Sequence, residues 1–80
     1  MKFIGSKVSL GNRGEFHVIR ARSFDLSPGH DYPKGMTTFA VVSESAPDEY
    51  LEIIQSSIPR HAYNLCMASA RYKATHPARY

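Results

Sequence analysis

Cys66 is the only cysteine in this chain of 80 residues, and that fact limits how the chain can be stabilised. A single cysteine closes no internal disulfide bond. A domain of this size buries only about 60–65% of the surface of its unfolded chain, so one apolar core must supply its stability. Small secreted domains usually add disulfides for this reason, and the lone thiol therefore predicts a reducing, cytoplasmic setting.

The composition is typical of one small globular domain spanning residues 1–80. Apolar residues make up 42% of the chain and charged residues 21%, which excludes a disordered or collagen-like chain. The longest apolar runs, such as residues 39–42, contain four residues. A membrane-spanning helix needs roughly 20 apolar residues, so we expect no membrane segment.

Alternation of apolar and polar residues predicts a hairpin over residues 2–24. Residues 2–10 form its first strand, with Ile4, Val8 and Leu10 facing inward. The glycines of residues 11–14 favour a turn, because glycine tolerates a positive φ angle. Residues 15–24 form the second strand, and either of its faces can be the buried one. One face carries Phe16, Val18, Arg20, Arg22 and Phe24, and the other carries His17, Ile19 and Ala21.

A loop and a third strand complete the first half of the chain. Pro28, Gly29 and Pro33 interrupt regular structure, so we expect a loop over residues 25–35. Residues 36–43 follow as a strand that is apolar on both faces. A strand with two apolar faces is usually central in its sheet or covered on both sides.

The second half of the chain shows helical signals. Ser45 suits a helix cap, Pro47 suits a first turn, and apolar residues from Tyr50 to Ile58 recur at helical spacing. Pro59 ends or kinks that helix, or begins a new one. A second helical stretch is expected over residues 60–74, followed by a flexible tail at residues 76–80.

The predicted fold class is therefore α+β, with elements in the order β-β-β-α-α. Two helical segments are expected to pack on one face of a small three-stranded antiparallel sheet. The apolar periodicity assigns the largest contributions to stability to six residues. These are Val8, Phe39, Val41, Leu51, Ile54 and Leu65.

Charge is strongly segregated along the chain, whose formal net charge is +3. Residues 44–52 contain four acids and no base, and residues 53–80 contain no acid at all. Among the first 22 residues, every charged side chain is basic except that of Glu15. This balance permits attraction to nucleic acid or to acidic protein surfaces without establishing either.

Two basic and aromatic groups are the candidate partner-binding residues. Arg20 and Arg22 lie on the second predicted strand beside aromatic residues, where a sheet can stack bases and hold phosphates. The alternative is that the aromatic rings pack inward while the arginine stems cover the sheet edge. The second group lies near the C-terminus, where the helix dipole alone also favours cations. It consists of Arg60, Arg71, Tyr72 and Lys73.

No pattern in the chain predicts catalysis, a cofactor or a metal ion. Cys66 and His61 are five residues apart, so on a helix they point about 140° apart and do not meet. Cys66 shares an apolar stripe with Ala62 and Leu65, which predicts a buried, inert thiol. None of the four histidines has a partner at metal-ligand spacing, and we expect them at the surface. The acids of residues 44–52 are explained by a helix N-terminus and a solvated face. We therefore expect a protein that is not an enzyme.

In type, the chain resembles the small phage-encoded inhibitor proteins, among them the anti-CRISPR proteins. The resemblance rests on length, on the starting residues Met1-Lys2-Phe3-Ile4 and on the order of strands before helices, and it has no specific motif. It implies a non-enzymatic inhibitor that docks on a partner protein and blocks a host nucleoprotein complex. The alternative is a nucleic-acid-binding module that uses the two basic groups. An exposed sheet edge also makes a homodimer an expected partner state.

Overall fold

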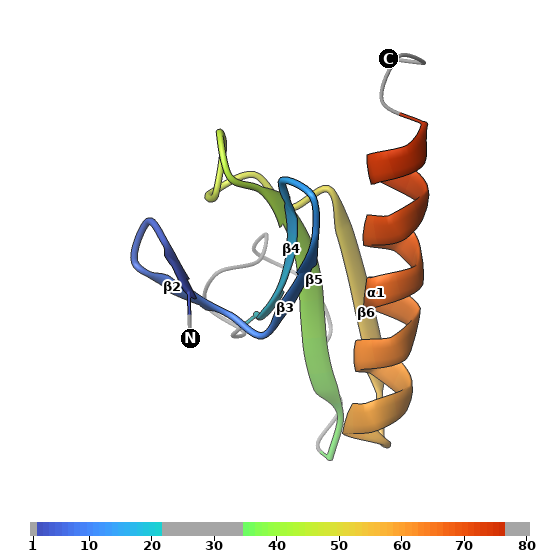
Figure 1. The fold of residues 1–80 in the computed structure, drawn as a ribbon. Coiled ribbons are helices and arrows are strands. Elements are labelled where there is room, and N and C mark those ends of the chain that lie inside the picture. Colours follow the sequence, from blue (N-terminus) through green and yellow to red (C-terminus); the bar gives the residue numbers. More distant parts are fainter. Residues whose placement is uncertain (1, 22–34, 77–80) are drawn as a thin grey trace.

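The structure is a computed structural model that describes residues 2–21 and 35–76. Within these residues, one helix covers one face of a four-stranded antiparallel sheet, and a small hairpin lies on the other side (Figure 1). The sheet order is β3-β4-β5-β6, and β1 pairs with β2 in a separate two-stranded sheet. The elements are β1 Lys2–Ile4, β2 Lys7–Ser9, β3 Gly11–Arg13, β4 Phe16–Arg20, β5 Thr37–Ser43, β6 Glu52–Ser56 and α1 Pro59–Thr75.

The predicted first strand, residues 2–10, is wrong because it is broken by a tight turn. Ile4 pairs with Lys7, so Gly5 and Ser6 form a two-residue hairpin loop between β1 and β2. Gly5 has a φ of 59°, and glycine at the first loop position with positive φ is the mark of a type II′ turn. The loop between β3 and β4 has the same form, with Gly14 at a φ of 61°. Two short hairpins therefore replace the single predicted one.

The predicted helix from Ser45 to Ile58 is also wrong. Residues 44–51 form successive turns, in which the N–H of Ala46 donates to the carbonyl of Ser43 and that of Glu49 to Ala46. Residues 52–56 then form β6, which pairs with β5. The β-branched Ile53 and Ile54 suit a strand, and pairing with β5 outweighs their helical spacing. The predicted three-stranded sheet with two helices is therefore wrong: residues 2–21 and 35–76 form six strands in two sheets and one helix.

The helix α1 begins at Pro59, and its N-cap residue is Ile58 rather than a serine. Proline suits this first helical position, since it has no N–H to leave unpaired. Ser56 helps the chain to turn, because its side chain accepts a 3.1 Å hydrogen bond from the N–H of Ile58. The helix ends at Thr75, close to the end predicted for residues 60–74. In the described residues, no helix is long and apolar enough to cross a membrane.

Small residues bring α1 close to the sheet. Three of its residues, Ala62, Cys66 and Ala70, are fully buried, and they recur every four residues. At Gly11 of β3 the approach is so close that a Cβ atom would collide with the Tyr63 hydroxyl group. The core between helix and sheet consists of Phe16, Val18, Phe39, Val41, Ala62, Cys66 and Ala70.

A second apolar cluster fills the opposite face of the sheet. It consists of Ile4, Ile19, Ala21, Ala40 and Val42, with Tyr50 packed against it. Both faces of β4 and β5 are therefore buried, which confirms the prediction that residues 36–43 form a covered, central strand. The ambiguity between the two faces of residues 15–24 has the same explanation, because both faces face a core.

The predicted core residues have mixed outcomes. Phe39 and Val41 are buried as expected, and Ile54 is half-buried against the core below the helix. Leu51 and Leu65 were expected to be buried but are exposed, at 38% and 43%. Both leucines were assigned to the core from predicted helical faces. Leu51 lies in the turn before β6 rather than on a helix, and Leu65 lies on a side of α1 that the sheet does not cover. The predicted loop at residues 25–35 lies outside the described residues except for Gly35, and so does the predicted tail beyond His76.

Candidate functional site

The outer face of α1 is the side of the helix that points away from the sheet. Because a helix turns once in about 3.6 residues, burial of Ala62, Cys66 and Ala70 directs the opposite side to solvent. Every residue on that side is exposed. The outer face of α1 consists of Arg60, His61, Asn64, Leu65, Ala68, Arg71, Tyr72 and Thr75.

This face carries cations and no acids. Arg60 and Arg71 are eleven residues apart, which is close to three helical turns, so they lie in one row along the helix. The helix contains no Asp or Glu. Among the described residues, no carboxylate forms an ion pair with either guanidinium group. Both charges are therefore available to a partner of opposite charge.

The acidic turn that contains Glu44, Asp48 and Glu49 lies on the other side of the molecule. Lys7 of β2 forms a 2.9 Å ion pair with Asp48, and Pro47 lies against Gly5 in the β1–β2 loop. The acidic turn is thus held against the small hairpin, which lies on the face of the sheet opposite α1 (Figure 1). The predicted explanation of these acids, a helix N-terminus, is wrong, since residues 44–51 form turns. The acids of this turn are therefore separated from α1, whereas Glu52 of β6 pairs with Val41 on the helix-facing side of the sheet.

The structure brings together three of the predicted site residues. Arg60, Arg71 and Tyr72 all lie on the outer face of α1. Lys73 follows them in sequence but is half-buried, since its position on the helix turns toward the sheet. As the basic residue in the last turn, it also complements the helix dipole.

Arg20 is exposed but separate from Arg71 and Tyr72. It ends β4 and pairs with Phe39, so it lies on the helix-facing side of the sheet. Ala74 lies near Gly14 and Tyr63 near Gly11, which places the end of β4 close to the start of α1. Arg20 is therefore at the Arg60 end of the molecule. Arg22 lies outside the described residues.

The predicted basic and aromatic strip on the sheet is not assembled. Phe16 and Val18 are buried below α1, so neither can stack on a ligand. Phe24 lies outside the described residues. The alternative in which the aromatic ring packs inward is the one observed for Phe16.

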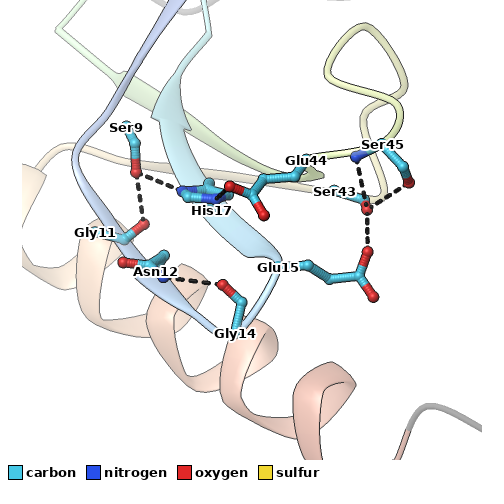
Figure 2. Close-up of polar contacts among 9 residues, drawn as sticks. All are labelled: Ser9, Gly11, Asn12, Gly14, Glu15, His17, Ser43, Glu44 and Ser45. Atoms are coloured by element: carbon cyan, nitrogen blue, oxygen red, sulfur yellow. Dashed lines mark hydrogen bonds and ion pairs between the residues drawn. The ribbon is translucent and has the colours of Figure 1, made fainter. Parts of the chain in front are cut away.

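A buried polar chain on the hairpin side of the sheet was missed by the sequence analysis (Figure 2). His17 of β4 is fully buried, contrary to the expectation of surface histidines. Its Nδ1 atom lies 2.7 Å from the hydroxyl of Ser9, which also donates a 3.3 Å hydrogen bond to the carbonyl of Gly11. Its Nε2 atom lies 3.5 Å from Oε1 of Glu44 and makes no hydrogen bond. Alternation along β4 places His17 on the same apolar face as Ile19, which was the one available signal.

The order serine, histidine, carboxylate is also that of a hydrolytic triad, but the geometry of these three side chains does not suit catalysis. The imidazole has no exposed surface, and the N–H of Leu10 after the serine is already bonded to Val18. A triad needs free N–H groups to stabilise an oxyanion. The Ser9–His17 contact ties the end of β2 to β4, and Glu44 in the turn after β5 lies close to the imidazole without a hydrogen bond to it. In the described residues, no cluster of three metal-ligating side chains is present.

A second, exposed polar cluster lies beside this chain at the end of β5. The hydroxyl of Ser43 donates a 2.8 Å hydrogen bond to the carboxylate of Glu15 and lies 3.0 Å from the hydroxyl of Ser45 (Figure 2). The N–H of Glu44 also donates to the carbonyl of Glu15. Ser45, predicted to cap a helix, instead helps to join this turn to the β3–β4 loop.

Cys66 is fully buried in the core, as predicted from its apolar stripe. Desolvation by burial, aided by the nearby charge of Glu52, raises the pKa of the thiol from 9.0 to about 11. The reactive thiolate is therefore rare near neutral pH.

We expect two consequences for Cys66. Its labelling by a thiol reagent in the native protein at pH 8 is expected to be much slower than in the unfolded chain. Because the unfolded thiol ionises first, its contribution to stability is complete below pH 9 and is lost as the pH rises to about 11. Denaturation curves of the wild type and Cys66→Ala across this range provide the test. Parallel pH profiles for the two proteins would contradict the raised pKa.

The chain was compared with protein-family models, with curated proteins and with solved structures, and none of these comparisons finds a match. The candidate site is therefore defined by its own geometry.

Proposed function

We propose that this chain is a non-enzymatic binding protein that docks on a partner protein through the outer face of α1. The observation that carries the proposal is the row of Arg60 and Arg71, exposed beside Tyr72 on a helix without acids. Arginine and tyrosine are the residue types that most often dominate protein interfaces. An acidic protein surface is the complementary partner.

The alternative is direct binding of nucleic acid, which the same arginines favour. Phosphate binding gains affinity from each cation that releases counterions. The outer face of α1 offers two arginines interspersed with exposed apolar side chains such as Leu65. This mixture suits a protein interface better than a phosphate backbone, so the protein partner is preferred.

The finer parts of the proposal rest on the sequence. The resemblance in type to small phage-encoded inhibitors supports a role as an inhibitor of a nucleoprotein complex. The lone free thiol supports a cytoplasmic location. A homodimer belongs to the same proposal, because β6 lies at one edge of the four-stranded sheet and unpaired edges promote association.

The test compares the charge-reversal variant Arg60→Glu/Arg71→Glu with a matched control, Arg13→Glu. All three arginines are exposed, and Arg13 lies on β3 rather than on α1. Tagged proteins are incubated with nuclease-treated host lysate and bound proteins are quantified. The double variant is expected to lose a specific complex at least tenfold, because each reversed charge repels an acidic partner. The control is expected to retain it.

Random duplex and single-stranded DNA and RNA serve as the second arm of this experiment. We expect no submicromolar binding of the wild type to them at physiological salt. Tight binding to all sequences, with log affinity falling by about 0.9 per phosphate contact against log salt on duplex DNA, would instead support the nucleic-acid alternative. Equal recovery of the complex by the double variant and the wild type would remove the outer face of α1 from the function.

A further inference from the structure

A row of apolar side chains begins at Ile58, the N-cap residue just before α1, and continues along one side of the outer face of α1. Ile58, Leu65 and Tyr72 are exposed by 61%, 43% and 62%, and they are spaced by seven residues. Seven residues fall only about 20° short of two helical turns, so the three side chains lie nearly in line over about 21 Å. They are among the most exposed large apolar residues in the described part of the chain.

The residues between them complete a coiled-coil type of pattern. Three residues after each apolar residue, the positions on the same side are His61, Ala68 and Thr75, all exposed. We call these six residues the exposed seam: Ile58, His61, Leu65, Ala68, Tyr72 and Thr75. Alternating spacing of three and four residues is the pattern that packs against another helix by knobs-into-holes contacts.

Charge restricts what can lie on the exposed seam. Arg60 and Arg71 occupy the row beside it on the outer face of α1, and α1 has no acid. A second copy of α1 would bring arginines against arginines, which is unfavourable. A helix with acids flanking its apolar positions would instead meet opposite charge.

One residue of the seam is held in place before any partner arrives. The ring of Tyr72 stacks on that of His76, with 4.1 Å between ring centroids and 15° between planes. His76 is itself anchored, since its N–H donates to the carbonyl of Tyr72. An aromatic side chain fixed in this way loses little conformational entropy on binding and makes a favourable anchor.

We propose that the exposed seam docks an acidic amphipathic helix of a partner protein, with Leu65 and Tyr72 as the apolar anchors and Arg71 as the flanking charge. This inference rests on the proposed function and specifies the class of partner. Nucleic acid fits the seam less well, because none of its six positions carries an arginine or lysine to meet a phosphate group. The helix-in-groove mode of peptide recognition uses the same spacing of apolar anchors.

The test uses a synthetic 21-residue helical peptide with leucine at alternating three- and four-residue spacing and glutamate on both flanks. Binding is followed by chemical-shift changes of backbone amides and by fluorescence anisotropy of the labelled peptide. We expect the shifts to map to α1, and Leu65→Ala and Tyr72→Ala each to weaken binding about tenfold, the usual size of a hot-spot effect. Both side chains are exposed, so the fold should survive. Leu51→Ala, another exposed leucine away from α1, is the matched control and should bind like the wild type.

Two control peptides separate the contributions of spacing and charge. One keeps the composition but scrambles the leucines, and the other replaces every glutamate with lysine. Both are expected to bind at least tenfold more weakly. Equal binding of the scrambled peptide, shifts that map away from α1, or no binding of the acidic peptide at millimolar concentration would each overturn the proposal.

The cellular complex distinguishes this inference from the proposed function. If the complex is lost in Arg60→Glu/Arg71→Glu but retained in Leu65→Ala/Tyr72→Ala, the protein docks through its charges and the seam proposal is wrong. If neither double variant loses it, the proposed function fails as well. Loss in both, with retention in Leu51→Ala, supports both proposals.

Discussion

Replacing Ile19 with alanine is expected to lower the free energy of unfolding by about 2–5 kcal/mol, the usual cost of truncating a buried isoleucine. Ile19 is 1% exposed and lies in the second core, against Ala40 and Val42. This core lies on the side of the sheet away from α1, so the variant tests a cluster that the helix does not cover. Chemical denaturation followed by circular dichroism measures the effect.

The matched control for Ile19 is Leu65→Ala. Leu65 is of similar size but is 43% exposed, and its removal is expected to cost less than about 1 kcal/mol. Sequence periodicity alone assigned Leu65 to the core and would predict a cost of about 2–5 kcal/mol for its removal. A larger loss for Leu65→Ala than for Ile19→Ala would show that the packing of the two faces is described incorrectly.

Replacing Ser9 with alanine is expected to cost about 1–3 kcal/mol, because it removes the one hydrogen-bond partner of the fully buried His17 ring. The other ring nitrogen, Nε2, has no hydrogen bond to compensate. The loss should also loosen the attachment of the β1–β2 hairpin, since Ser9 ends β2. Hydrogen exchange of the hairpin amides, together with thermal unfolding, measures both effects.

Ser57→Ala is the control for Ser9, since Ser57 is exposed. It is expected to change stability by no more than about 0.5 kcal/mol. Unfolding of Ser9→Ala at the wild-type temperature, with unchanged exchange in the hairpin, would show that the Ser9–His17 contact does not link the hairpin to the sheet.

The helical prediction for residues 45–58 shows where local signals fail. Ser45, Pro47 and the apolar spacing each favour a helix. None of these local signals shows that β5 needs a strand beside it on one edge. Pairing with residues 52–56 satisfies the backbone of β5 and covers part of the core. Such pairing joins residues more than ten positions apart, so no local pattern reveals it.

The candidate site was predicted in part. The absence of acids after Glu52 is visible in the sequence and pointed to Arg60, Arg71 and Tyr72, which the structure places on one exposed face. Their common face follows from helical geometry once α1 is known to be one uninterrupted helix from Pro59 to Thr75. The exposed seam was not predicted, because Leu65 was assigned to the core.

The amino-acid sequence by itself determined the burial of both faces of residues 36–43, the burial of Cys66 and the cationic C-terminal helix. These features depend on the run of apolar residues, on helical spacing and on charge, and all three can be read from the sequence without knowing the fold. Only the tertiary structure decided that residues 52–56 are a strand, that His17 is buried beside Ser9 and Glu44, and that Leu65 faces solvent. Each of these depends on which distant segment packs against a residue, and small residues at Ala62, Cys66 and Ala70, rather than the larger Leu65, let α1 approach the sheet most closely.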